Sequence, residues 1–288
     1  YSQLDTCLAA ARRAYEVPEK LGIMAGAGTQ SLLQFIPSLL PCGGIVWIDE
    51  PTYNEHRPAW EAAGHQVITG DANLDKAQSA VIVAPNNPTG KFVHDAIMAT
   101  AKQTAATGGI MLIDGAFAMP AAADPAAGDL LDALAAFPHV LHIRSFGKFF
   151  GMAGLRLGFA IGAAMHMDQL QRCVGPWAVS SVALDIGNTA LNDTVWQAQH
   201  SQFLRQQTEQ LQMVLTRANL KILGGTTLFQ TVKTSRANHL HDHLAKAAIW
   251  TRKFSQMPDL LRFGVPANEA DFARLSESLN NWRHKANQ

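Results

Sequence analysis

The stretch from Ser145 to Phe159, SFGKFFGMAGLRLGF, is the feature that most restricts how this chain can fold. It follows a short, mostly apolar run at 140–143 that is typical of a buried strand. A serine, a lysine and an arginine lie there among four glycines, which let the backbone approach a ligand closely. Because a hydroxyl, an amine and a guanidinium suit a phosphate, the stretch predicts an anion-binding loop at a strand end, with a lysine that can act as a nucleophile.

The composition narrows the kinds of partner that the chain can have. Hydrophobic residues make up 48% of the 288 residues, while charged residues make up only 16%, below the usual quarter of a soluble chain. This low charge favours a large buried interface and therefore an oligomer. The formal net charge is zero and there is no basic run, which argues against nucleic acid as a partner. No apolar run approaches the roughly 18 residues of a membrane span, so no membrane partner is expected.

No group of residues has the spacing of a metal site. The three cysteines, Cys7, Cys42 and Cys173, lie far apart and are odd in number, which is typical of reduced thiols in a cytoplasmic protein. In the HLHDH run only His239 and His243 would share a helix face. We expect that face to be solvated and no metal to be bound.

Strand-like apolar runs alternate with helical patterns from residue 22 to residue 165, which predicts an α/β fold with a mostly parallel, doubly wound sheet. The expected strands are 22–25, 45–48, 65–69, 80–84, 110–113, 140–145 and 157–161. After residue 176 the pattern changes to one long polar helix or two in tandem at 180–219, a glycine turn at 224–225 and further short strands. We therefore expect a large α/β domain over 16–189 and a small C-terminal α+β domain over 190–288.

Four of the expected strand ends carry residues that a ligand site requires. They are the glycine turn at 26–30, Asn87 in the tight turn PNNPTG, Asp114 and Lys148. Taken alone, the glycine turn also fits an ordinary helix cap, and Asn87 also fits an Asx turn bonded to its own backbone. Ligands of α/β proteins bind at the carboxyl ends of the strands. Together the four features fit one ligand with a phosphate, a phenolic oxygen and a protonatable ring nitrogen, namely pyridoxal 5′-phosphate.

Several motifs give the chain a resemblance to a known group of enzymes. They are NNPTG at 86–90, DGAF at 114–117, RSFGKFFG at 144–151 with GLRLGF at 154–159, and LRFG at 261–264. With these motifs the chain resembles the fold-type I pyridoxal-phosphate enzymes of the histidinol-phosphate aminotransferase-like branch. Within that branch it is most similar to the cobalamin-biosynthesis L-threonine O-3-phosphate decarboxylases. The resemblance spans residues 26 to 264.

The resemblance implies a role for each matching residue around the cofactor. Lys148 is expected to form the Schiff base, Asp114 to pair with the pyridine nitrogen and Asn87 to bond the 3′-oxygen. The cofactor phosphate is expected to bind Ser145 and Arg156.

Further positions in the resemblance concern the rest of the cofactor and the substrate. The backbone N–H groups of Thr29 and Gln30 are expected to share the phosphate. His56 matches the position of an aromatic residue that stacks on the ring, and Tyr53 near it could also stack, although either residue could be purely structural. Arg262 is expected to bind the substrate carboxylate, and Arg252 a second substrate anion, such as its phosphate.

The chain departs from the family pattern at several positions. Phe117 replaces a tyrosine whose hydroxyl also bonds the 3′-oxygen in many relatives, and Gln230 lies where an arginine is expected. The family's N-terminal arm is largely missing. The resemblance also implies a homodimer with the active site at the interface, in which a tyrosine comes from the neighbouring subunit, and Tyr1 is a weak match to that tyrosine.

Three functions are consistent with these residues. The first is decarboxylation of L-threonine O-3-phosphate to (R)-1-amino-2-propanol phosphate in cobalamin biosynthesis. The second is a histidinol-phosphate-type aminotransferase, which would remove the Cα proton with the same residues. The third, from another class, is a catalytically silent scaffold that retains the fold, which the changes at Phe117 and Gln230 make conceivable.

Overall fold

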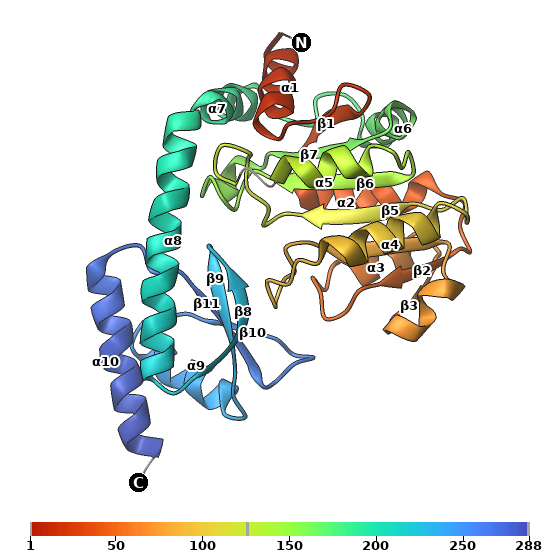
Figure 1. Ribbon diagram of the computed structural model, residues 1–288. Helices are drawn as coiled ribbons and strands as arrows, with labels where there is room; N and C mark the ends of the chain where they lie inside the picture. The colour runs from red at the N-terminus through yellow and green to blue at the C-terminus, as the bar shows by residue number, and fades with distance from the viewer. Residues whose placement is uncertain (1, 125–126, 287–288) are drawn as a thin grey trace. The chain divides into compact units, whose positions relative to one another are not determined.

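The computed structural model describes residues 2–124 and 127–286 and contains two compact units (Figure 1). The large unit comprises residues 1–87 and 92–198, and the small unit comprises residues 88–91 and 199–288. The division falls inside helix α8 (Thr194–Arg217), later than the boundary after 189 that the sequence pattern suggested. The short segment 88–91 groups with the small unit, which the sequence pattern did not indicate.

A seven-stranded sheet in the order β1-β7-β6-β5-β4-β2-β3 forms the centre of the large unit. The strands are β1 (Gly22–Gly26), β2 (Ile45–Ile48), β3 (Gln66–Ile68), β4 (Ser79–Val83), β5 (Met111–Gly115), β6 (Val140–Ser145) and β7 (Gly158–Gly162). All pairs are parallel except those that β7 makes with β6 and β1. The predicted fold class, a mostly parallel α/β sheet, is therefore confirmed.

Helices cover both faces of this sheet because neighbouring residues on its central strands alternate between two apolar clusters. Val81 and Leu112 pack with α2 (Thr29–Phe35), α3 (His56–Ala62) and α6 (Ala164–Val174). Ile82 and Ile113 pack on the other face with α4 (His94–Thr104) and α5 (Ala127–Leu134). The remaining helices of this unit are α1 (Ser2–Ala14) and α7 (Ser181–Asn192), with 3₁₀ turns η1 (Ile36–Leu39), η2 (Asp71–Lys76) and η3 (Ala153–Leu155). The central strands β4 and β5 thus present apolar side chains to both faces of the sheet, as in other doubly wound sheets.

Two helical stretches of the chain are interrupted. Helix α2 ends at Phe35 and the chain continues as η1, because Pro37 cannot supply a backbone donor. The sequence left one long helix or two in tandem open for 180–219, and the structure shows two helices, α7 and α8, separated at Asp193. The Asp193 carboxylate accepts a hydrogen bond from the backbone N–H of Trp196 at 2.9 Å and so caps the second helix. Helix α6 was not anticipated.

The small unit has an antiparallel sheet in the order β10-β11-β9-β8. Its strands are β8 (Lys221–Thr226), β9 (Phe229–Lys233), β10 (Arg252–Lys253) and β11 (Leu260–Gly264), and its helices are α9 (Ala237–Lys246) and α10 (Glu269–Ala286). Leucines of α8, α9 and α10 pack with Val232 and Phe263 of the sheet into one core. The turn predicted at 224–225 is wrong, because both glycines lie within β8 beside a bulge and the chain reverses two residues later.

The structure also bears on the cysteines and on membrane spans. Cys7, Cys42 and Cys173 are free thiols, and Cys7 is buried. Within 2–124 and 127–286, the helices lack the length and apolar character needed to cross a bilayer.

Candidate active site

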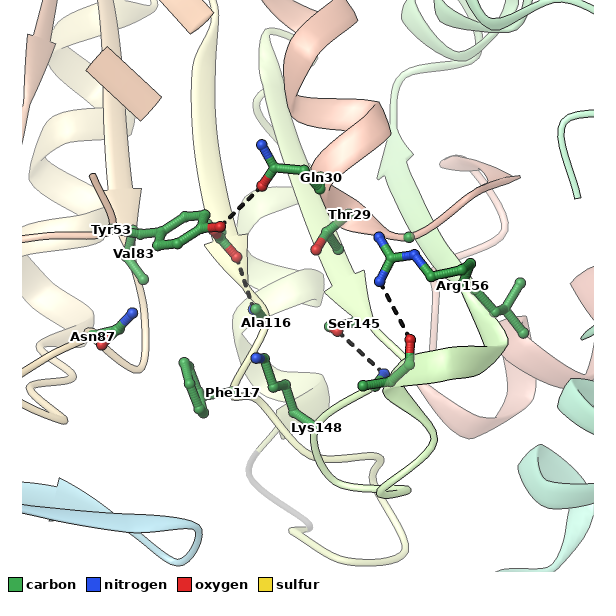
Figure 2. Close-up of a pocket in the computed structure, with 15 residues that line it drawn as sticks. Thr29, Gln30, Tyr53, Val83, Asn87, Ala116, Phe117, Ser145, Lys148 and Arg156 are labelled. Atoms are coloured by element: carbon green, nitrogen blue, oxygen red, sulfur yellow. Dashed lines mark hydrogen bonds between the residues drawn. The ribbon is translucent and has the colours of Figure 1, made fainter. Parts of the chain in front are cut away.

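One cavity of the large unit lies where the carboxyl ends of the parallel strands meet, and it collects most of the predicted site residues (Figure 2). It is lined by side chains and backbone from five chain segments: Gly28, Thr29 and Gln30; Tyr53; Val83 and Asn87; Asp114, Ala116 and Phe117; and Ser145, Gly147, Lys148, Ala153, Arg156 and Leu157. The four strand-end features predicted from the sequence therefore share one cavity.

Arg156, Ser145 and the turn after β1 form one corner of this cavity. Arg156 has a left-handed φ of 56°, and its guanidinium donates to the carbonyl oxygens of Ala153 at 3.3 Å and Ala27 at 3.4 Å. Gly28 has a φ of 81°, and a Cβ there would lie 2.7 Å from Nη2 of Arg156. Only glycine therefore allows the guanidinium to approach the turn. The Ser145 hydroxyl accepts from the Gly147 backbone N–H at 3.2 Å, and the corner is polar and cationic.

Asp114 provides a buried carboxylate at the end of β5. It is 3% exposed. Its Oδ1 accepts a hydrogen bond from the Ala116 backbone N–H at 2.9 Å, and its Oδ2 lies 3.0 Å from Nε2 of His56. A buried carboxylate is stable only when such partners satisfy it. The two contacts hold the orientation of Asp114.

His56 lies behind Asp114 and does not line the cavity, which corrects its predicted placement against a ligand ring. Helix α3 starts at His56, and this side chain is 1% exposed. Tyr53 lines the cavity instead, and its hydroxyl donates to Oε1 of Gln30 at 3.0 Å. The sequence made both rings candidates, but only packing of α3 against the sheet distinguishes the inward residue from the one facing the cavity.

Lys148 extends into the cavity from the loop after β6 (Figure 2). Its Nζ lies 5.4 Å from the centroid of the Phe117 ring. Phe146 and Phe150, on either side of Lys148, are buried, and their rings stack at 4.3 Å between centroids. The loop is therefore anchored by its phenylalanines, which leaves the lysine amine directed at the cavity.

Asn87 lines the cavity across from Lys148 (Figure 2), and the residue before it, Asn86, is anchored by a hydrogen bond. Asn86 is 5% exposed, and its Nδ2 donates to the carbonyl oxygen of Pro51 at 3.0 Å. Val83 and Ala116 contribute apolar wall to the same cavity. The cavity thus combines an amide, an amine, a buried carboxylate and a guanidinium around apolar and aromatic wall.

The two arginines predicted to bind substrate form a pair within the small unit. Arg252 of β10 and Arg262 of β11 are direct cross-strand neighbours. The Arg262 guanidinium lies 4.9 Å from the centroid of the Phe229 ring. Burial, and secondarily the positive charge of Arg252, lower the pKa of Arg262 to about 10, so it remains a cation at neutral pH. Their part in binding substrate remains a prediction.

Gln230, which lies where an arginine was expected, has a structural position in the same sheet. It is 3% exposed. Its Nε2 donates to the carbonyl oxygens of Thr226 at 3.0 Å and Phe229 at 2.9 Å, and its Oε1 accepts from Gln212 at 3.2 Å. These bonds hold the β8–β9 hairpin.

The remaining sequence hypotheses concern histidines and the N-terminus. His243 is half-buried, and its Nε2 lies 2.8 Å from the Ser278 carbonyl oxygen, so the helix face expected to be solvated is partly packed. The described residues contain no group of three side chains arranged to bind a metal. Tyr1 lies outside the described residues.

Comparison with known proteins gives a consistent result for fold and sequence. The family model "Aminotransferase class I and II" matches residues 3–279. The threonine-phosphate decarboxylase of Pseudomonas aeruginosa is 37% identical over 268 residues, covering 91% of this chain and 79% of that protein. The threonine-phosphate decarboxylase of a Sinorhizobium species is 37% identical over 262 residues, or 88% of this chain and 75% of that protein.

Solved structures agree on the fold. The histidinol-phosphate aminotransferase of Sinorhizobium meliloti, solved in complex with pyridoxal 5′-phosphate, superposes with a TM-score of 0.85 at 19% identity. The match covers 99% of this chain and 82% of that one. At this identity the likeness concerns the fold.

Proposed function

The chain belongs to the aminotransferase class I and II family, and from this premise we propose that it is a pyridoxal-phosphate enzyme that decarboxylates a phosphorylated amino acid. The proposed reaction converts L-threonine O-3-phosphate into (R)-1-amino-2-propanol phosphate, a step of cobalamin biosynthesis. The observation that carries the proposal is the single cavity that unites Lys148, Asp114, Asn87 and Arg156. The choice of decarboxylation rests on the 37% identity with the Pseudomonas aeruginosa protein.

The residues of the cavity fit the cofactor in chemical type. The corner of Arg156, Ser145 and the turn at Gly28 suits a phosphate, because it combines a guanidinium with a hydroxyl and with the backbone at the start of helix α2. Asp114 is a buried acceptor for a protonated ring nitrogen, and Asn87 can donate to a phenolic oxygen. Lys148 supplies the amine that condenses with the aldehyde. Tyr53, rather than His56, is the ring we propose to face the cofactor.

Each polar side chain then has a definite task. When bound, the cofactor supplies a ring that accepts the electron pair released as a bond to the substrate Cα breaks. Asp114 holds the ring-nitrogen proton, and His56 keeps the Asp114 carboxylate oriented through the 3.0 Å contact between Nε2 and Oδ2. His56 is therefore a positioning residue.

We propose that a side chain of the small unit determines which bond to the substrate Cα is broken. The side chain that orients the substrate carboxylate would decide which bond to the substrate Cα can break when the cofactor is bound. Arg262 is proposed to bind that carboxylate through its two parallel N–H donors, and Arg252 a second substrate anion. The proposed products are carbon dioxide and the amine, and Nζ of Lys148 would hold the proton that replaces the carboxylate at Cα.

We also propose that the protein works as a cytoplasmic homodimer. The low charged fraction supports a large subunit interface. Apolar side chains are exposed on α7 and α8, including Val182 and Val195, which are 64% and 66% exposed. A solution mass measurement by light scattering distinguishes the monomer from the dimer.

The main alternative is an aminotransferase of the histidinol-phosphate type, which uses the same cavity but removes the Cα proton. The fold shared with the Sinorhizobium meliloti aminotransferase favours it as the second candidate. A catalytically silent scaffold is the third.

One experiment separates these functions. The protein is loaded with pyridoxal phosphate and incubated with L-threonine O-3-phosphate while carbon dioxide, aminopropanol phosphate and oxo acid are measured. Carbon dioxide with aminopropanol phosphate and no oxo acid is the expected result. Transamination of histidinol phosphate without carbon dioxide release would favour the aminotransferase, and failure to acquire visible absorbance with the cofactor would favour the scaffold.

A further inference from the structure

The segment that follows Asn87 is held by the small unit. Residues 88–91 group with that unit, although the residues before and after them belong to the large unit. The hydroxyl of Thr231, on β9, donates to the carbonyl oxygen of Pro88 at 2.6 Å. Thr231 is fully buried, with 0% exposure, so no water competes for this bond.

Glycines of the β8–β9 hairpin reinforce this contact. Gly90 has a φ of 72°, and a Cβ there would collide with the backbone of Gly225. A Cβ on Gly224 would likewise collide with the carbonyl oxygen of Thr89. The two backbones are therefore in direct contact, which requires glycine on both sides.

Asn87 is thus held between two anchors. On its N-terminal side, the Asn86 side chain bonds to Pro51 at 3.0 Å within the large unit. On its C-terminal side, Pro88 bonds to Thr231 within the small unit. With both neighbours fixed, the Asn87 amide has little freedom to leave the cavity wall that it lines.

Thr231, which bonds to Pro88, also lies in the same cross-strand row of the small sheet as Arg252 and Arg262. In the small sheet Arg252 lies opposite Arg262, Arg262 opposite Thr231, and Thr231 opposite Gly224. Directly opposite residues of antiparallel strands point to the same face of a sheet. Arg262 and Thr231 are therefore side by side on the face that receives the segment 88–91.

We propose that Thr231 is a positioning residue that fixes the Asn87 amide through Pro88. Thr231 and Arg262 are direct cross-strand neighbours. The residue proposed to position Asn87 and the residue proposed to bind the substrate carboxylate therefore lie side by side in the small sheet. The inference rests on the proposed function, in which Asn87 donates to the phenolic oxygen of pyridoxal phosphate. A donor on that oxygen stabilises its anion, so displacement of Asn87 raises the pH at which the bound cofactor changes its visible absorbance.

The test compares matched threonine variants. Thr231→Val removes the hydroxyl at nearly constant volume, and Thr231→Ser restores it. Thr208→Val is the control, because Thr208 is also a buried threonine of the small unit that donates to a backbone carbonyl, that of Thr227 at 3.0 Å. Cofactor affinity, the midpoint pH of the absorbance change and amide exchange of residues 86–92 in the cofactor-free protein are measured for each variant.

The valine variant is expected to bind pyridoxal phosphate about 2- to 10-fold more weakly, as for the loss of one hydrogen bond. Its absorbance midpoint is expected to rise and its exchange at 86–92 to quicken. Thr231→Ser and Thr208→Val are expected to match the wild type. In an Asn87→Ala background, Thr231→Val should change the affinity and the midpoint no further, because both variants remove the same contact.

Other outcomes overturn the inference. An effect of Thr231→Val that adds fully to that of Asn87→Ala, or no effect when Asn87→Ala has one, contradicts positioning through Asn87 while the proposed function stands. Failure of the wild type to bind the cofactor contradicts both. If the valine variant does not fold, Thr231→Ala is judged by the same criteria.

Discussion

The cavity of the large unit and the arginine pair of the small unit handle charge in opposite ways. Asp114 is buried, and the protein itself satisfies it through His56 and the Ala116 backbone. Arg262 and Arg252 are instead two like charges in adjacent strands, and burial, followed by their proximity, lowers the pKa of Arg262. The first arrangement is complete without substrate, whereas the second becomes more favourable when an anion binds between or beside the two cations. The cofactor side of the proposed site is thus preformed, and the substrate side gains from its ligand.

Replacing Lys148 is expected to have the largest effect on function. Lys148→Ala removes the amine that both condenses with the cofactor and returns the proton to Cα, so the visible absorbance is expected to disappear and kcat to fall more than about 1000-fold. Absorbance spectra and carbon dioxide release check this. Residual turnover near the wild-type rate would mean that the cavity is not the catalytic centre.

The arginine pair gives the next largest effect. Arg262→Lys keeps the charge but loses the two-pronged geometry, so kcat/KM is expected to fall about 100-fold, while Arg252→Gln is expected to cost less. The pKa of Arg262, lowered to about 10, also sets a pH limit. The guanidinium is charged below that value and loses its proton above it, so substrate affinity is full at neutral pH and falls above about pH 10.

Measuring KM against pH for the wild type and for Arg252→Gln tests this assignment. Removing the neighbouring charge raises the pKa of Arg262, so the loss of affinity should move to higher pH. If affinity is lost at the same pH in Arg252→Gln as in the wild type, Arg252 does not influence the binding of the carboxylate.

Replacing His56 is expected to have the smallest effect on activity. Its effect on the free energy of unfolding is expected to differ from that of a change in the arginine pair. His56→Ala leaves one oxygen of the buried Asp114 carboxylate without its partner, so the free energy of unfolding is expected to fall by about 1–3 kcal/mol. Activity is expected to fall roughly 10-fold. By contrast, Arg252→Gln removes an exposed cation from a like-charged pair and is expected to change stability by less than about 0.5 kcal/mol. Urea unfolding of both variants measures these free energies, and equal losses of stability in the two variants would contradict the prediction.

Local patterns in the chain were sufficient for most of the large unit. The strands at 45–48 and 140–145 were predicted at their observed bounds, and the order of strands and helices led to a mostly parallel sheet. The turns that carry Asn87 and Lys148 follow apolar strands in sequence, so the order of the elements alone was enough to expect their meeting at one sheet edge.

Long-range packing decided what the sequence could not. His56 and Tyr53 are three residues apart and both planar, and only the burial of α3 against the sheet turned His56 to Asp114 and Tyr53 to the cavity. Gly224 and Gly225 have the local character of a turn, but they lie in a strand that pairs with β9, and the backbone at 89–90 packs directly against them.

The sequence by itself therefore determined the fold class and the chemistry of the loop at 145–159, since those depend on residue types and on spacing along the chain. The tertiary structure alone decided which ring faces the cavity and which strand bonds to Pro88, the residue after Asn87. Those outcomes depend on contacts such as that of Thr231 with Pro88, 143 residues apart, and no local pattern encodes a partner at that separation.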